Sequence, residues 1–330
     1  MTGSPGDAEF GFELVTCRWA ERAWPPDRER DAVPVVARQL GTRNRRWDTV
    51  VVEADPAGLA AREAFGERTL DADLLHVVRH APAEWAWYRD TLPDPGYPWR
   101  YVRAAIHRAE ARDVVRTRRD GNRIEIRRIA PYPEWVRRIV AVENKPDLSA
   151  SAARALGDQL SHDVETALAD EVWVATAATS ETVEPALLED LPVEAGVLVL
   201  DFEGGGGPDA RVAWHPATLD PTTDTSLSAP EKAAKRLELA ERAYGSGWRS
   251  YVETMRPDCR WFELREEAGA LVPWCAATEC HQTAAECSGS CPEFQPEPPA
   301  WRTRGWPIEG GPGKGIQRLL ARRRRRQRRR

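Results

Sequence analysis

The sequence predicts an α/β fold in which helices cover both faces of a mixed β-sheet. Apolar runs of strand length recur at 137–145, 170–177 and 195–203, and helix-like segments lie between them. Continuous apolar strands indicate a sheet that is buried on both faces, whereas a half-exposed sheet would alternate apolar and polar residues. A chain of 330 residues can bury such a core and carry a second domain.

The N-terminal part is predicted to form one helix and two strands. Apolar residues recur at helical spacing over 9–24, which predicts an amphipathic helix. Residues 32–41 and 45–55 have the composition of strands, and the residues between them, 41–44, predict a tight turn. We therefore expect these two strands to be joined directly.

Helix and strand alternate again after the strand at 137–145. Ser149 or Ser151 can cap a helix over 150–169, because either hydroxyl can accept a hydrogen bond from a free backbone amide of the first turn. A helical turn or two is predicted at 184–191, ahead of the last buried strand.

A second long helix is predicted over 228–245. A capping box from Ser228 to Glu231 marks its start, and Gly245 marks its end. The glycine-rich residues 204–210 before it predict a linker or a long turn.

Residues 66–130 differ in character and are predicted to form an inserted domain. Two alternating runs flank Asp120 and Gly121, a dipeptide that strongly favours a β-hairpin. Three helix-like segments precede this hairpin, at 70–81, 82–92 and 97–115. Three helices followed by a basic hairpin is the element order of a winged helix, so we expect a winged-helix-like domain here.

The remaining domain boundaries follow from this division of the chain. The core is predicted to combine residues 1–65 with 131–215. Residues 216–300 are predicted to form a helical and cysteine-rich C-terminal region, and 301–330 a disordered basic tail.

Composition and charge favour a protein of the cytoplasm that does not contact a membrane. No apolar run approaches the ~20 residues that a membrane span requires. The first residues lack the basic start and apolar run of a signal peptide, so we do not expect export. The net charge is −5 although the last ten residues contain eight arginines, so the rest of the chain is strongly acidic. An acidic body fits a salty cytoplasm, and the arginine-rich tail would bind phosphate backbones without sequence preference.

Polar side chains with catalytic potential stand where a buried strand ends, at Glu143-Asn144-Lys145. Lysine is scarce, with four among 47 basic residues, so this one is unlike the common surface cation. Alternation along a strand places Glu143 and Lys145 on one face and Asn144 on the other. Asp48 opens the preceding core strand, and its carboxylate meets that of Glu143 if the two strands are neighbours. Two carboxylates suit Mg²⁺ or Mn²⁺, and a lysine beside them can orient water or offset charge on a phosphate.

This arrangement resembles the PD-(D/E)xK nuclease superfamily, whose restriction-endonuclease-like core runs α-β-β-β-α-β. The resemblance covers 9–203 with the insertion set aside, and the chain also resembles a group of haloarchaeal proteins. It implies that Asp48 and Glu143 are metal ligands and that Lys145 is the catalytic lysine of a Mg²⁺-dependent phosphodiester hydrolase.

Two further residues enter through this resemblance. Gln159 matches a glutamine that many members carry on the helix after the motif, and Glu13 matches an acidic residue of the first helix. The sequence departs from the family pattern at Trp47, where a proline is expected, and in the long chain between the aspartate and the glutamate. Asp55 is an alternative to Asp48 as the aspartate of the motif.

The inserted segment is rich in arginine and is predicted to contact nucleic acid, DNA rather than RNA. The predicted contacts are Arg100, Arg103 and Arg108 on the last helix and Arg118, Arg119 and Arg123 in the hairpin. A winged helix reads DNA with a helix in the major groove and a hairpin on the phosphates. Because the insertion lies between the two strands of the motif, we expect it to deliver substrate to the site. A solvated arginine surface is the alternative.

Cysteines cluster near the C-terminal end, and in a cytoplasmic protein such a cluster indicates a bound metal more than disulfides. Some nucleases that this chain resembles close the nuclease domain with a [4Fe-4S] cluster held by the first helix and a C-terminal segment. That resemblance implies Cys17 with three of four C-terminal cysteines, namely Cys275, Cys280, Cys287 and Cys291. The spacing matches neither a zinc ribbon nor a ferredoxin, so Zn²⁺ and no metal stay open.

The sequence therefore predicts a metal-dependent nuclease that acts on DNA. One alternative is an inactive nuclease-fold protein that binds DNA or regulates another protein. Another is a cysteine–metal interaction module without nuclease activity. The alternative for the three residues themselves is that Asp48 and Glu143 are ordinary polar residues at strand ends, with Lys145 paired to Glu143.

Overall fold

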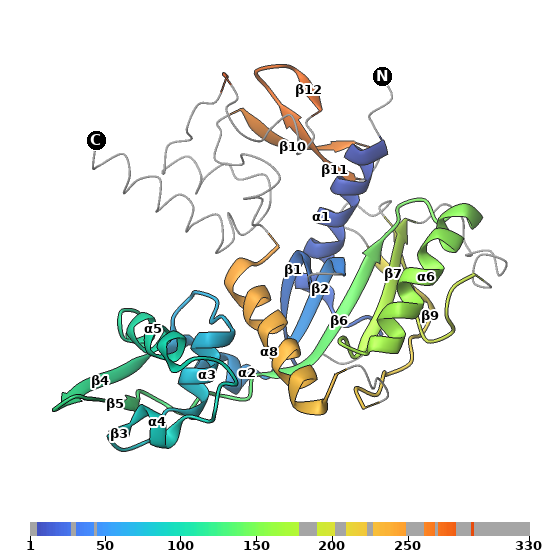
Figure 1. The fold of residues 1–330 in the computed structure, drawn as a ribbon. Coiled ribbons are helices and arrows are strands. Elements are labelled where there is room, and N and C mark those ends of the chain that lie inside the picture. The colour runs from blue at the N-terminus through green and yellow to red at the C-terminus, as the bar shows by residue number, and fades with distance from the viewer. Residues whose placement is uncertain are drawn as a thin grey trace.

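The computed structural model describes a six-stranded mixed sheet with helices on both faces (Figure 1). The described residues are 5–27, 31–42, 45–177, 190–201, 209–222, 227–248, 261–267, 270–281 and 292–293. The strand order is β1-β2-β6-β7-β8-β9. An α/β fold with a mixed, buried sheet is thus confirmed.

The central sheet combines antiparallel and parallel neighbours. Its strands are β1 (Val33–Gly41), β2 (Arg46–Ala54), β6 (Val136–Asn144), β7 (Glu171–Ala177), β8 (Gly196–Asp201) and β9 (Asp209–Trp214). The pairs β1–β2, β2–β6 and β8–β9 are antiparallel, and β6–β7 and β7–β8 are parallel. Parallel neighbours need a crossover connection, and the helix between β6 and β7 provides one. β9 was not predicted from the sequence, because a partly exposed strand has a shorter apolar run than a buried one.

One face of the sheet is covered by α1 (Pro5–Ala23). Phe12, Leu14 and Trp19 of this helix pack in one buried cluster with Val51 and Val142 of the strands. This contact explains the alternate valines of β2 and β6, because every second side chain of a strand points to the same face.

The other face is covered by α6 (Ala150–Thr166) and α8 (Ala229–Ser246). Ser149 is the residue that caps α6, since its Oγ accepts a hydrogen bond from Ala152 N over 3.3 Å. Residues of α8 pack on Ala37, Val50 and Ile139 of the sheet, so this helix completes the core instead of belonging to a separate C-terminal region.

The predicted capping box of α8 is confirmed, but the predicted stop is two residues early. Ser228 donates its hydroxyl and its backbone N–H to Glu231, at 2.6 and 3.0 Å. The helix continues past Gly245 and is capped by Gly247, whose φ of 66° lies in the left-handed region. Gly245 serves packing, because a Cβ there would lie 1.8 Å from Thr69 Oγ1.

The inserted segment runs between β2 and β6 and has its own buried cluster around Val77, Ile106 and Ile126. Its elements are α2 (Pro56–Arg62), η1 (Glu63–Phe65), α3 (Ala72–His80), β3 (Ala86–Trp87), α4 (Tyr88–Thr91), α5 (Trp99–Glu110), β4 (Val115–Asp120) and β5 (Arg123–Arg128). The three strands form a second sheet in the order β3-β5-β4. The predicted helix at 82–92 is wrong as one element. Ala86 and Trp87 pair with Ile126 and Glu125, a ladder that no local pattern reveals.

The insertion joins the sheet where β2 ends and β6 begins (Figure 1). Asp48 lies at the start of β2 and Glu143 at the end of β6, whereas the chain leaves β2 after Ala54 and returns at Val136. Six residues of strand separate Asp48 from Ala54, which is about 20 Å. The connection therefore does not itself bring the inserted domain to these carboxylates.

A buried ion pair fixes the insertion to the core. Arg62 of α2 donates from Nε and Nη2 to the carboxylate of Glu241 on α8, at 2.5 and 2.6 Å, and both side chains are 0% exposed. Tyr132 and the backbone N–H of Leu70 donate to the same carboxylate, at 2.7 and 2.9 Å. Four donors to one carboxylate satisfy its oxygens without water.

A third sheet lies near the C-terminal end, where the sequence analysis expected a cysteine-rich region. Its strands are β10 (Phe262–Glu267), β11 (Ala270–Cys275) and β12 (Cys280–His281), and β11 packs beside α1. The predicted tail at 301–330 and nearly all of the predicted turn at 184–191 lie outside the described residues.

The helices in the described part of the chain were also compared with the requirements of a membrane span. None of them combines the necessary length with the necessary apolar character.

Replacing Arg62 by methionine is expected to lower the free energy of unfolding by about 3–5 kcal/mol, because it leaves the buried carboxylate of Glu241 without its cation. Arg154→Met is the matched control, since its pair with Asp190 is exposed and should be worth at most about 1 kcal/mol. Urea unfolding followed by circular dichroism measures both. Equal losses in the two variants would contradict the anchoring role.

Candidate functional site

A cavity of about 590 Å³ lies at the end of the central sheet where β2 begins and β6 ends. All five residues that the sequence analysis singled out for catalysis line it: Glu13, Asp48, Glu143, Lys145 and Gln159. They come from α1, β2, the end of β6 and α6. The fold therefore brings together side chains that lie up to 146 positions apart in the sequence.

Strand register explains why Asp48 and Glu143 meet. In the antiparallel pair β2–β6, Thr49 lies opposite Val142 and Val50 opposite Ala141. The next opposing positions are Asp48 and Glu143, and directly opposed residues project to the same face. The backbone N–H of Asn144 donates to Asp48 Oδ2 over 3.0 Å, which holds the aspartate against the end of β6. The expectation that these two strands are neighbours is confirmed.

The carboxyl of Glu143 is crowded by burial and by like charge. Its residue is 5% exposed. Burial raises the pKa of Glu143 to about 8, the nearby charge of Asp48 adds to the rise, and Arg45 opposes it. Positive charge beside this carboxyl favours its deprotonated form.

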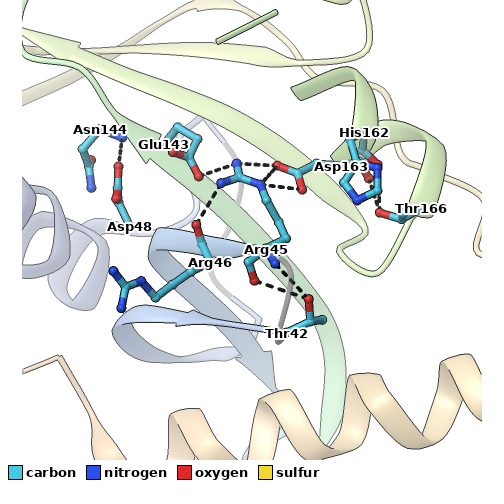
Figure 2. A network of polar contacts seen from close by, with 9 residues as sticks. All are labelled: Thr42, Arg45, Arg46, Asp48, Glu143, Asn144, His162, Asp163 and Thr166. Atoms are coloured by element: carbon cyan, nitrogen blue, oxygen red, sulfur yellow. Dashed lines mark hydrogen bonds and ion pairs between the residues drawn. The ribbon is translucent and has the colours of Figure 1, made fainter. Parts of the chain in front are cut away.

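Arg45 supplies one such charge, and the sequence analysis missed it (Figure 2). Its Nη2 donates to Glu143 Oε1 and to Asp163 Oδ2, both at 2.7 Å, and its Nε donates to Asp163 Oδ1 at 2.9 Å. Asp163 on α6 is 1% exposed, so the guanidinium joins two buried carboxylates. Burial lowers the pKa of Arg45, but hydrogen bonds to Asp163 and the charge of Glu143 outweigh it and raise the pKa overall. No local pattern could have revealed partners 98 and 118 positions away.

Glu13 acts with two residues of β1. Its carboxylate accepts a bidentate pair of hydrogen bonds from Arg38, at 2.9 and 3.2 Å. Burial raises the pKa of Glu13, and Arg38 opposes that rise. With both oxygens engaged, Glu13 holds Arg38 in place instead of presenting free oxygens to the cavity.

Gln39 bridges Glu13 and Asp48. Its Nε2 donates to Glu13 Oε2 over 3.1 Å and to Asp48 Oδ1 over 3.0 Å. Its φ of 49° is left-handed, and the β1–β2 register passes from Arg38–Thr49 to Leu40–Trp47 around it. Such a conformation is rare for a residue with a side chain and is often found at functional sites. Here it turns the amide between two carboxylates.

Lys145 lies in the cavity but not in the way that strand alternation predicts. β6 ends at Asn144, so the alternation stops before Lys145. The Lys145 Nζ forms an ion pair with Glu9 of α1, and its backbone N–H donates to Ala175 O over 2.8 Å. The lysine therefore contacts α1, and it lines the same cavity as Glu143.

Of the two remaining candidates, Gln159 lines the cavity, whereas Asp55 lies far from it. Gln159 is an exposed residue of α6 that lines the cavity. Asp55 lies at the far end of β2, where its carboxylate caps α2 through Gly58 N at 2.7 Å and binds Arg137 at 2.7 Å. Asp55 is therefore a structural residue, and its candidacy as the aspartate of the motif is wrong.

The oxygen ligands at the cavity fit a small divalent cation. Among the described residues no group of three or more His, Cys, Asp or Glu side chains is arranged to hold a metal. Mg²⁺ needs fewer protein ligands, because it commonly uses one or two carboxylates together with water and substrate phosphate. Asp48 and Glu143 supply two, and the repulsion that raises the pKa of Glu143 is what a cation would relieve.

Cys17 of α1 lies in the core of the protein, against β2. It is fully buried, with its Sγ 3.3 Å from Thr49 Oγ1 of β2. Burial raises its pKa, as does Glu13, so the thiol stays protonated. Cys275 on β11 is half-buried and its Cα pairs in register with that of Cys280, whereas Cys287 and Cys291 lie outside the described residues. A bound cluster or Zn²⁺ stays a prediction, and the direction of Cys17 toward the central sheet does not favour its part in it.

The three predicted arginines of α5 differ in whether their charge is neutralised by neighbouring side chains. Arg108 is neutralised by ion pairs of 2.6 and 3.1 Å with Asp71 and Asp73. Arg100 lies over the ring of Tyr101, 4.7 Å from its centroid, and Arg103 is exposed.

The predicted arginines of the hairpin divide between its two sides. Arg118 and Arg123 lie over the rings of Trp85 and Trp87, at 4.7 and 4.8 Å from the centroids. Arg119 is exposed and projects to the opposite side of the strand from Arg118.

Arg45→Met is expected to lower the free energy of unfolding by about 3 kcal/mol or more, since it leaves Asp163 and Glu143 buried without their cation. Adding Asp163→Asn should recover part of that loss, and a double-mutant cycle measures the coupling. Arg46→Met is the control, because Arg46 is the exposed next residue, at the start of β2. Additive effects of the Arg45 and Asp163 changes would refute this network.

Comparison with known proteins gives one match. Residues 35–296 match DUF5787, a family of unknown function, and this range includes Asp48, Glu143, Lys145 and Gln159. No curated protein and no solved structure matches the chain. Because the match spans most of the sequence, the protein belongs to the DUF5787 family.

Proposed function

We propose that this protein is a metal-dependent nuclease that hydrolyses phosphodiester bonds of DNA. The observation that carries the proposal is the convergence of Asp48, Glu143, Lys145 and Gln159 on one cavity at the end of the sheet. With the insertion set aside, the element order is α1-β1-β2-β6-α6-β7. This order supports the resemblance to the α-β-β-β-α-β core of the PD-(D/E)xK superfamily.

Asp48 and Glu143 would hold the divalent cation. When bound, the cation would supply positive charge for the phosphate oxygens and the attacking water. The chain positions both ligands with hydrogen bonds from its own residues: Gln39 and Asn144 N fix the carboxylate of Asp48, and Arg45 fixes that of Glu143. Catalytic groups that are held in place in this way need little rearrangement during reaction.

Lys145 would act on the phosphate or the attacking water. Its ammonium group lines the cavity and is paired with Glu9, whose side chain is 46% exposed. An exposed ion pair is weak, so a phosphate entering the cavity can compete with Glu9 for this cation. Lys145 is then placed to offset the negative charge that grows on the phosphate.

The inserted domain supports a role in binding DNA. Its helices α3, α4 and α5 precede the β4–β5 hairpin, and β3 pairs with the hairpin as a third strand. Three helices followed by a basic hairpin is the order of a winged helix, which binds DNA.

A DNA-binding protein that does not cut is the second candidate. It is favoured by the ion pair of Arg45 with Glu143 Oε1, which neutralises one of the two carboxylates that the cation would need. The two candidates differ in whether the cavity turns over a substrate.

Incubation of the purified protein with single-stranded and double-stranded DNA and Mg²⁺ or Mn²⁺ is expected to yield cleaved products on a denaturing gel. Lys145→Ala and Asp48→Asn should each reduce the rate at least about 100-fold, because each removes a group that acts at the phosphate. Lys235→Ala and Asp158→Asn are matched controls, since both residues are exposed and neither lines the cavity.

Retention of DNA binding without any cleavage would favour the second candidate. Equal rates in the wild type and in Lys145→Ala would refute the assigned site.

Mg²⁺ or Mn²⁺ is expected to raise the melting temperature of the protein, because a ligand that binds the native state stabilises it. At a cation concentration of 100 times Kd, the free energy of unfolding should rise by about 2.7 kcal/mol. Asp48→Asn should remove this shift and Asp158→Asn should keep it. Thermal unfolding with and without EDTA measures the shift independently of activity. An unchanged shift in Asp48→Asn would place the cation elsewhere.

A further inference from the structure

One side of the β3-β5-β4 sheet carries a row of arginines and two tryptophans. In the β4–β5 hairpin, Arg116 lies opposite Arg127, Arg118 opposite Glu125, and Asp120 opposite Arg123, and opposed pairs separated by two positions project to the same side. Trp87 of β3 lies opposite Glu125 and joins this side. We call this surface the Arg–Trp face, formed by Trp85, Trp87, Arg116, Arg118, Arg123 and Arg127.

The Arg–Trp face is turned to solvent, because the opposite side of the same sheet is buried. Val115 and Ile126, at alternate positions to the arginines, are 1% and 0% exposed and pack with Val102 and Ile106 of α5. All four arginines of the face are exposed, and the two tryptophans are half-buried. Figure 1 shows the β4–β5 hairpin at the outer edge of the inserted domain.

Guanidinium groups stack on both indole rings of this face. Arg118 and Arg127 lie 4.7 and 4.9 Å from the ring centroid of Trp85, and Arg123 lies 4.8 Å from that of Trp87. These distances are within the range of cation–π attraction. The contacts hold the two half-buried rings beside the arginines.

The face keeps a positive charge although the chain as a whole is acidic. The face carries four arginines and two acidic residues, Asp120 and Glu125. Arg118 is paired with Glu125 at 2.6 Å, and Arg116 is only loosely paired with Asp113 at 3.9 Å. Within the described part of the chain, no carboxylate forms an ion pair with Arg123 or Arg127. This excess of positive charge is complementary to a polyanion, and the rings are complementary to flat bases.

We propose that the Arg–Trp face binds single-stranded nucleic acid, with bases stacked on Trp85 and Trp87 and phosphates held by the arginines. Stacking on aromatic side chains requires bases whose faces are free, and in a duplex those faces are covered by neighbouring base pairs. The face therefore selects an unpaired strand. It is distinct from α5, the helix that a winged helix would place in the major groove of a duplex.

The inference rests on the proposed function for the choice of a nucleic acid as partner. Binding at the Arg–Trp face and chemistry at the cavity are separable, because the insertion joins the sheet about 20 Å from Asp48 and Glu143. Binding can therefore be measured in EDTA, where metal-dependent cleavage does not occur.

Fluorescence anisotropy in the presence of EDTA tests the proposal. It measures the affinity of the protein for a labelled DNA strand, first alone and then annealed to its complement. We expect the wild type to bind the single strand more tightly than the duplex. Trp85→Leu should weaken single-strand binding about five-fold or more, and Trp85→Tyr should retain most of it, since tyrosine keeps a ring for stacking. Arg123→Ala should reduce the slope of log K against log salt by about 0.7, the loss of one phosphate contact.

Arg79→Ala is the matched control, because Arg79 is an exposed arginine of the same domain, on α3, to which no contact with nucleic acid is assigned. It should leave affinity and salt slope unchanged. Equal affinity for duplex and single strand would overturn the proposal. So would loss of binding in Arg79→Ala with none in Trp85→Leu and Arg123→Ala. Circular dichroism melts establish that each variant is folded. If Trp85→Leu does not fold, the proposal is tested by the salt slope of Arg123→Ala alone, since Arg123 is exposed at the hairpin and its replacement should not affect folding.

The two proposals fail in different ways. Intact single-strand binding without cleavage in Mg²⁺ would refute the nuclease and leave the Arg–Trp face standing. Cleavage that persists while wild-type and variant proteins bind DNA equally would refute the face and leave the nuclease.

Discussion

Two carboxylates face each other at the end of a buried sheet, and the surrounding structure is arranged to compensate for them. The register of β2 on β6 fixes Asp48 opposite Glu143, because Thr49 and Val142 are paired just before them. Burial adds to the repulsion between them and raises the pKa of Glu143 to about 8. Each carboxylate accordingly has its own donors: Arg45 for Glu143, and Gln39 with the backbone of Asn144 for Asp48. A register shifted by one residue would turn one carboxylate to the opposite face, so that the two carboxylates would no longer lie side by side.

The same register divides the molecule into two regions with different tasks. Asp48 and Glu143 lie at one end of their strands, and the inserted domain is attached at the other end. The Arg62–Glu241 pair holds that domain against α8, and because both partners are fully buried neither can be lost without leaving the other uncompensated. A buried pair of this kind fixes relative position more than it adds stability. The proposed binding face and the proposed catalytic cavity are thus held apart on one scaffold.

Arginine serves different purposes in these regions, and its surroundings decide which. Arg45 and Arg62 are engaged by buried carboxylates in several directions and act as structural cations. Arg108 is neutralised at the surface by two aspartates. Arg123 and Arg127 lie on indole rings, which carry no net charge and so do not neutralise the guanidinium groups. The number of arginines in the inserted segment therefore says less about binding than the partners that each one has.

The sequence by itself determined the apolar strands, the helices that alternate with them, the hairpin at Asp120-Gly121, and the polar residues at the strand ends where the cavity lies. These features are local, because periods of two and of 3.6 residues can be recognised within a short window. Only the tertiary structure decided that Arg45 reaches Glu143, that Lys145 turns toward α1, that α8 completes the core, and that Trp85 and Trp87 stand beside the arginines of the hairpin. Each of these depends on which distant segments pack together and in which register. Those choices are set by the burial of the whole core, which no single segment of the sequence specifies.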